Sequence, residues 1–161
     1  MRGSSQIGCS MKVCGVEINS NDVNVCLLSL ADGLFELPDF RSRRLTLTNI
    51  NSTRDLRSFQ QSFAKLMQDY QVDRVVIRQR PMKGKFAGGA VGFKLEAAIE
   101  LISDLDVIIM STTDIKDSLK RNPIQIDYAE TDLKAYQEVA FNTAYAYLMK
   151  AKYDAKEEWA R

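Results

Sequence analysis

The hydrophobic period of this chain changes near residue 56, and that change limits the fold more than any other feature. Residues 11–18 (MKVCGVEI) and 44–48 (RLTLT) alternate between apolar and polar side chains, and residues 22–30 (DVNVCLLSL) are rich in valine and leucine. Such segments are typical of β-strands. From Leu56 onward, apolar side chains recur every three or four residues, as on one face of a helix. The sequence therefore predicts three antiparallel strands followed by helical segments.

Two short apolar runs interrupt the helical half. Residues 72–77 (VDRVVI) and 106–110 (DVIIM) have the apolar composition of buried parallel strands. The order predicts an α/β domain with a mixed five-stranded sheet, three antiparallel strands and then parallel strands, and helices on both faces. We assign this single domain to residues 11–161, because residues 1–10 resemble an expression-vector leader. The expected helices run from the Ser52 cap to Tyr70, then over 90–102, from Ser111 or Thr112 to Arg121, and over 131–152.

The absence of histidine excludes several kinds of active site. Without imidazole there is no Ser-His-Asp or Cys-His machinery and no histidine zinc site. The three cysteines have no Cys-x-x-Cys spacing, which argues against a thiolate zinc site. The net charge of +1 gives no general preference for nucleic acid, and no apolar run is long enough to span a bilayer. We expect a cytoplasmic protein without a membrane partner.

The order of elements, with Gly15-Val16-Glu17 at the end of the first strand, resembles the ribonuclease H fold. The shape is similar to that of the RuvC type of bacterial Holliday-junction resolvase, and the resemblance extends from Met11 to Met149. More narrowly, the chain resembles a bacterial family, domain-of-unknown-function family three-thousand-ten. The segments that carry this likeness are VCGVEIN, FAKLMQDYQVDRVVI, KGKFAGGAVGFKLEAAIELI and IKDSLKRNPIQID.

The resolvase resemblance implies a centre in which three or four carboxylates hold two divalent metal ions. Glu17 stands at the first of these places, but Arg78 occupies the second. In the last helix the resemblance points to Asn142, with Glu138 one turn earlier. A residual nuclease using Mg²⁺ or Mn²⁺ would therefore centre on Glu17, with Glu138 or a loop aspartate such as Asp22 or Asp127 recruited. The alternative is that Glu17 forms an ion pair with a cation such as Arg78 or Lys116.

A basic loop, RQRPMKGKFAGG, lies between the strand at 72–77 and the next helix. Two glycines directly before a helix can leave backbone N–H groups and the positive end of the helix dipole available to a phosphate. The alternative is a solvated loop whose glycines serve only the turn. The residues predicted to contact DNA, RNA or phosphate are Arg78, Arg80, Lys83, Lys85, Gly88, Gly89, Lys94, Lys116, Lys120 and Arg121.

The last helix carries a second apolar stripe beside the one predicted to face the core. Phe141, Tyr145 and Leu148 make up this stripe, and partial exposure would make it a homodimer interface. An error in the helical phase would place it in the core instead. Three hypotheses therefore stand: a nucleic-acid binding protein with a degenerate acidic site and no required cofactor, a residual nuclease, and a homo-oligomeric interaction module. The stripe predicted to face the core is Leu133, Tyr136, Ala140, Ala144 and Tyr147.

Overall fold

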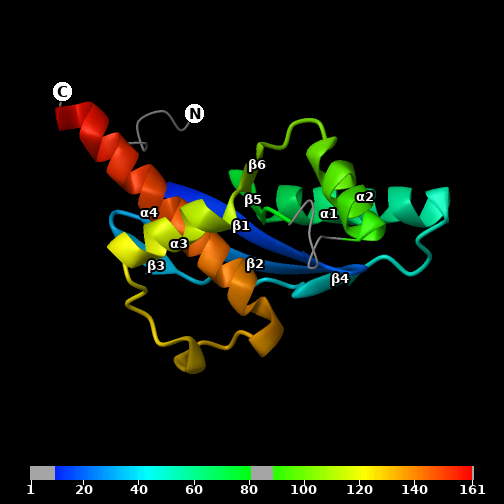
Figure 1. Ribbon diagram of the computed structural model, residues 1–161, viewed down its shortest axis with the longest axis horizontal. Coiled ribbons are helices and arrows are strands. Elements are labelled where there is room, and N and C mark those ends of the chain that lie inside the picture. The colour runs from blue at the N-terminus through cyan, green and yellow to red at the C-terminus, as the bar shows by residue number, and fades with distance from the viewer. Residues whose placement is uncertain (1–9, 81–88, 161) are drawn as a thin grey trace.

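The protein is described by a computed structural model in which one mixed sheet separates two layers of helices (Figure 1). The structure describes residues 10–80 and 89–160, with side chains up to residue 153. The predicted leader therefore lies almost wholly outside the described residues. In the described part of the chain, no helix is both long and apolar enough to cross a membrane.

The sheet follows the predicted mixed arrangement. Its spatial order is β3-β2-β1-β5-β6, and β4 pairs with β2 as well. β2 runs antiparallel to β1, β3 and β4, whereas β1, β5 and β6 are parallel. The strands are β1 (Ser10–Asn19), β2 (Asp22–Ala31), β3 (Leu34–Glu36), β4 (Arg44–Thr46), β5 (Arg74–Arg78) and β6 (Val107–Met110).

The third antiparallel strand differs from the prediction, because two short strands share its place. β3 pairs with residues 29–31 of β2, and β4 pairs with residues 22–24. The connection between them contains Pro38, which has no backbone N–H to donate to a ladder. Six strands therefore occupy five positions, and the edge of β2 has a gap between its two short partners.

The helices cover both faces of the sheet, as predicted. α1 (Thr53–Asp69) and α2 (Ala90–Glu100) pack on one face, and α3 (Thr112–Arg121) and α4 (Glu138–Ala160) on the other (Figure 1). The Ser52 and Ser111 hydroxyls accept hydrogen bonds from backbone N–H groups in the first turns of α1 and α3, so both predicted caps form.

The last helix begins later than predicted. Residues 128–130 and 135–137 form the short 3-10 helices η2 and η3 instead of α-helix. Local bonds hold this segment: the Thr131 hydroxyl donates to the carbonyl of Tyr128, and the Gln137 side chain accepts from the Lys134 N–H. Side-chain to backbone bonds of this kind compete with helical ones, which explains the later start.

Two hydrophobic clusters form the core, one on each face of the sheet. Cys14 belongs to one cluster and Cys26 to the other, and both thiols are buried and free. Burial raises the pKa of the Cys26 thiol to about 12 and raises that of Cys14 as well. Neither cysteine is therefore a thiolate near neutral pH.

The predicted interface stripe is wrong, because its residues lie in the core. Phe141, Tyr145 and Leu148 are at most 2% exposed. α4 approaches the sheet closely at Gly15, where an added Cβ would lie 2.0 Å from the carbonyl oxygen of Ala140. Of the stripe predicted to face the core, Ala140 and Ala144 are buried, whereas Leu133, Tyr136 and Tyr147 are half-buried and the first two precede α4. Phe35, which stacks on Tyr145, helps to cover the other stripe. The homodimer prediction loses the surface on which it depended.

Candidate functional site

Four polar side chains lie in one line across the sheet, and we call Arg44, Asn24, Glu17 and Arg78 the polar row. Asn24 is opposite Glu17 in the β1–β2 ladder and opposite Arg44 in the β2–β4 ladder. Arg78 follows Ile77, which is the partner of Val16 in β5 and β1. Because side chains alternate along a strand, Glu17 faces the same side as Gly15, which contacts α4.

Asn24 links the members of this row. Its Nδ2 donates to Glu17 Oε1 at 3.2 Å, and its Oδ1 accepts from Arg44 Nε at 2.8 Å. Asn24 is only 1% exposed, so these bonds satisfy both ends of a buried amide. On the other side of Glu17, Arg78 Nη1 lies 3.9 Å from Oε2. The alternative prediction, an ion pair between Glu17 and Arg78, is confirmed.

Arg44 is fixed at the other end of the row. Its guanidinium lies 3.9 Å from the centre of the Tyr136 ring, a cation–π contact. Its Nε also forms an ion pair with Asp22 Oδ2 at 3.9 Å, and Asp22 Oδ1 accepts a hydrogen bond from the Thr46 hydroxyl at 2.7 Å. Asp22 is therefore held by β4 and is not free to join Glu17.

The described residues do not fit a two-metal centre. They contain no group of three or more His, Cys, Asp or Glu side chains placed to hold a metal ion. Glu138 is exposed at the start of α4, and Asn142 is half-buried further along it. Asp127 caps η2 by accepting from the Ala129 N–H. Two metal ions would need further carboxylates beside Glu17, but the guanidinium of Arg78 lies there instead.

Arg80 was predicted to contact phosphate, but contacts within the fold occupy it. Its Nη1 donates to the carbonyl of Ile18, and its guanidinium lies 5.4 Å from the Phe93 ring centre. It also covers Gly92, where an added Cβ would lie 2.2 Å from Arg80 Cζ. Arg80 therefore ties the end of β5 to β1 and to the first turn of α2.

Glu96 lies one turn beyond Gly92 on α2. Its Oε1 is buried and has no hydrogen-bond partner in the described structure. Burial is the main cause that raises the pKa of Glu96, Glu100 raises it further, and Arg80 acts in the opposite direction. The carboxylate form of Glu96 is therefore disfavoured by its surroundings.

The remaining predicted basic residues that the structure describes do not form one patch. Lys83, Lys85 and Gly88 lie outside the described residues. Gly89 is the N-cap of α2 in an extended conformation, without a side-chain cap. Lys94 donates from Nζ to the carbonyl of Ile50 at 2.8 Å, on the α2 side of the sheet.

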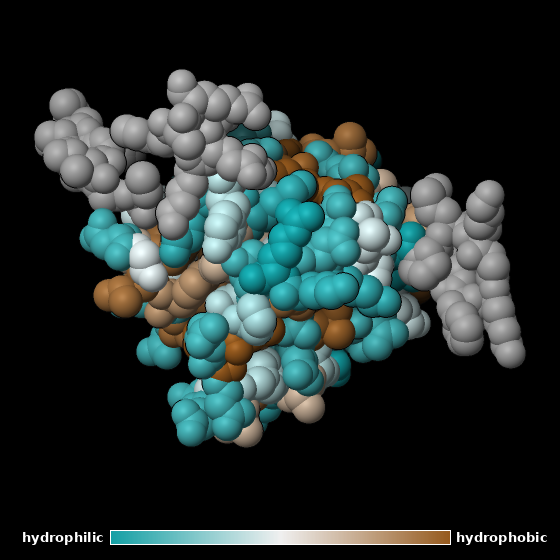
Figure 2. Space-filling model, turned by 60° about the vertical axis from the view of Figure 1, so that its left-hand side comes forward, coloured by the Kyte–Doolittle hydropathy of each residue, from teal (hydrophilic) through white to brown (hydrophobic). Residues whose placement is uncertain are grey.

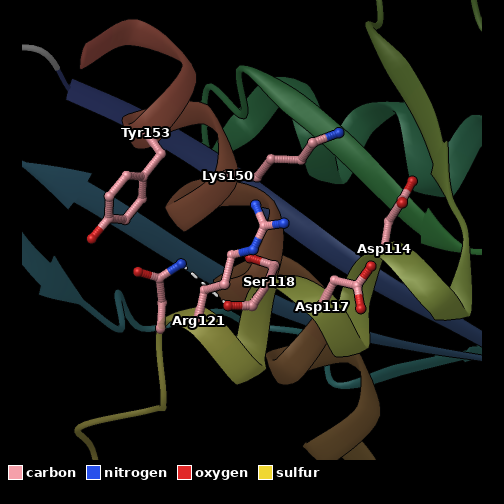
Figure 3. Close-up of a pocket in the computed structure, with 7 residues that line it drawn as sticks. Asp114, Asp117, Ser118, Arg121, Lys150 and Tyr153 are labelled. Carbon is pink, nitrogen blue, oxygen red and sulfur yellow. Dashed lines mark hydrogen bonds between the residues drawn. The ribbon is translucent and has the colours of Figure 1, made fainter. Parts of the chain in front are cut away.

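Three predicted cations lie on α3, on the opposite face of the sheet from Lys94. Lys116, Lys120 and Arg121 are exposed there. Lys120 and Arg121 are in the last turn, about 13 Å along the axis from the start of α3 at 1.5 Å per residue. Figure 3 shows Arg121 reaching toward the segment of α4 that carries Lys150, over a pocket of about 290 Å³. These cations form a separate surface.

Sequence reasoning missed a basic segment beside the polar row. Residues 41–44 (RSRR) hold three arginines and precede or begin β4. Arg41 forms an ion pair with Asp69 at 2.8 Å, Arg44 belongs to the polar row, and Arg43 is exposed. The density of arginine was the available signal, and the strand pattern that begins at Arg44 hid it.

Comparison with solved structures supports the ribonuclease H-like fold. The chain is similar to the RuvC structure from Thermus thermophilus, with a TM-score of 0.70 at 8% identity, over 89% of this chain and 97% of that one. T. thermophilus RuvC in complex with a Holliday junction substrate gives a TM-score of 0.68 at 10% identity, over 89% and 96%. At these identities the likeness shows the fold alone. A comparison with curated proteins found no match. A family model described as a protein of unknown function, DUF3010, matches residues 11–147, so the chain belongs to the DUF3010 family.

Proposed function

We propose that this protein binds the phosphate backbone of nucleic acid at the polar row and does not cut it. The observation that carries the proposal is the charge at the row: Arg44, Arg78 and the adjacent exposed Arg43 outnumber the carboxylates of Glu17 and Asp22, which leaves a net formal charge of +1. A centre that uses two divalent ions needs several carboxylates, whereas a positive row favours phosphate. The similarity of the fold to a resolvase solved with a Holliday junction supports a nucleic-acid ligand.

The two arginines at the ends of the row are the residues that would contact phosphate. The side chains of Arg44 and Arg78 are 37% and 38% exposed, so each can reach a ligand in solvent. Arginine suits this role because its planar fork matches two phosphate oxygens. The buried Asn24 holds Glu17 and Arg44 in place through its two hydrogen bonds. Arg43, which is exposed, adds a further positive charge next to Arg44.

The residual nuclease is the second candidate, and Glu17 is the residue on which it depends. Asn24 and Arg78 are the partners of Glu17, and a guanidinium beside its carboxylate disfavours a metal ion at the same place. The homodimer stays a prediction without an assigned surface. Lys83 and Lys85 stay predicted phosphate contacts.

One titration separates binding from cutting. Labelled duplex, single-stranded and four-way-junction DNA are titrated with the protein in Mn²⁺, and the same tubes are then resolved on a denaturing gel. We expect shifted and intact DNA, and weaker shifts for Arg78→Gln than for the matched control Lys65→Gln, which removes an exposed cation from α1. Cutting that disappears in Glu17→Ala would overturn the proposal, and so would the absence of any shift.

A further inference from the structure

The edge of β2 is interrupted between its two short partner strands. Val25, on one side of this gap, is already bonded: its N–H donates to the carbonyl of Arg43, and its carbonyl accepts from Gln137 Nε2. Neither short strand reaches Leu27, two residues further on, because their ladders cover residues 22–24 and 29–31. Main-chain groups point to the same edge at every second residue, so the N–H and carbonyl of Leu27 face the gap.

A pocket of about 400 Å³ opens at this gap. Its size is within the range of small-ligand sites, and its walls are mainly apolar. Leu27 and Gln137, both 2% exposed, lie at its inner side. Arg43, Glu130 and Asp132 add charged groups to its lining, and the apolar walls come from Leu37, Pro38, Phe40, Ile126 and Leu133.

These groups suit a ligand with an apolar body and hydrogen-bonding groups along one edge. The two ladders leave the N–H and the carbonyl of Leu27 outside their pairings, as a donor and an acceptor on the side of the gap. The carboxylates of Glu130 and Asp132 can accept from an exocyclic amino group. A nucleobase that carries such an amino group has the apolar faces, the hydrogen-bonding edge and the amino donor that this lining suits.

The pocket is lined by chain neighbours of the residues at the Arg44 end of the polar row. Arg43 lines the pocket and Arg44 belongs to the row, and the two are adjacent in the chain. On the other wall, Gln137 lines the pocket, and its neighbour in the chain, Tyr136, contacts the guanidinium of Arg44 with its ring. A strand whose phosphate rests on Arg44 would therefore have a neighbouring base within reach of the pocket.

We propose that this pocket takes one unpaired nucleobase of the nucleic acid that the polar row holds. The inference rests on the proposed function and adds that the ligand contains an unpaired base. A paired base is excluded, because its hydrogen-bonding edge is occupied by its partner. A bulge, a mismatch or a single-stranded end would supply the base at the lowest cost of unstacking.

The test places 2-aminopurine, a fluorescent base with an exocyclic amino group, in a one-nucleotide bulge of a DNA duplex. The matched probe has the same base fully paired. We expect the bulged duplex to bind at least about fivefold more tightly than the paired one, and the bulged base to be protected from acrylamide quenching. The variant Leu37→Trp, which fills the pocket, should remove both effects, whereas Leu34→Trp, at a 70% exposed site on β3, should keep them.

The outcomes separate the base pocket from backbone binding. Equal affinity for the two probes with no protection of the bulged base would overturn the pocket assignment while backbone binding stands. Binding of neither probe would overturn both. Protection of the bulged base by the unaltered protein is read without any variant, so a Leu37→Trp protein that fails to fold does not remove the test.

Discussion

At the scale of single residues, two glycines decide how closely the layers approach. Gly15 lies against the main chain of α4, and Gly92 lies against the flexible end of Arg80. A backbone cannot move without moving its whole helix, whereas a guanidinium can swing away. The two positions therefore respond differently to the same added methyl group.

We expect Gly15→Ala to destabilise the fold and Gly92→Ala to be much milder. The new Cβ at position 15 would lie 2.0 Å from the carbonyl oxygen of Ala140, so α4 must shift. Overpacking of this kind costs about 1–3 kcal/mol. Urea unfolding of both variants measures the difference, and a Gly15→Ala protein as stable as its Gly92→Ala counterpart would contradict the packing described above.

Glu96 predicts a pH dependence with a defined sign. Burial raises the pKa of its carboxyl in the folded state. The protonated form therefore contributes to the free energy of unfolding, and this contribution is fully present below the unfolded pKa. This contribution is lost as pH rises through the folded pKa. We therefore expect Glu96→Gln to raise the melting temperature at pH 7 and to have a smaller effect near pH 4. The control is Glu36→Gln, at an exposed site of β3; a pH-independent effect of Glu96→Gln would refute the assignment.

At the scale of elements, the connection between α3 and α4 depends on one buried amide. Gln137 is 2% exposed, accepts from the Lys134 N–H at 2.8 Å and donates to the Val25 carbonyl at 2.9 Å. It thus ties η3 to the edge of β2, next to the stretch at which β2 has no partner strand on that side. This contact with a residue 112 positions earlier in the chain adds a long-range tie to the local bonds that delay the start of α4.

Removing this amide should loosen the start of α4. Gln137→Ala leaves the Val25 carbonyl and the Lys134 N–H without their partner, which typically costs about 1–3 kcal/mol. We expect lower stability in urea and faster hydrogen exchange at the Lys134 amide. Gln125→Ala, at an exposed position of the same connection, is the control. Unchanged exchange in Gln137→Ala would show that other contacts hold the segment.

The sheet and most helices could be predicted from the sequence because their signals lie in neighbouring residues. The period-two strands, the serine caps of α1 and α3 and the alternation of β5 and β6 with helices follow from residues near one another. The local pattern did not predict which side chains of α4 are buried, because contacts with distant strands bury Phe141 and Tyr145. The polar row was predicted in part: Arg78 was matched to Glu17, but Asn24 and Arg44 join it only through strand register.

At the scale of the whole molecule, charge is distributed by the fold and not by composition. The chain has a net charge of +1, yet cations among the described residues lie in separate places: Lys94 on the α2 side, arginines in the polar row and residues 41–44, and three cations on α3. The face in Figure 2 is mainly hydrophilic, with apolar residues in small groups between polar ones. We therefore assign the proposed nucleic-acid binding to a local positive row on an otherwise balanced surface.

The most direct test of this claim is the salt dependence of four-way-junction binding for the unaltered protein and for Arg78→Gln. If Arg78 neutralises one phosphate, the slope of log K against log salt should fall in magnitude by about one in the variant, and the DNA should stay intact in Mn²⁺. Lys65→Gln should leave the slope unchanged. An identical slope in Arg78→Gln, or DNA cut by the unaltered protein, would contradict the central claim.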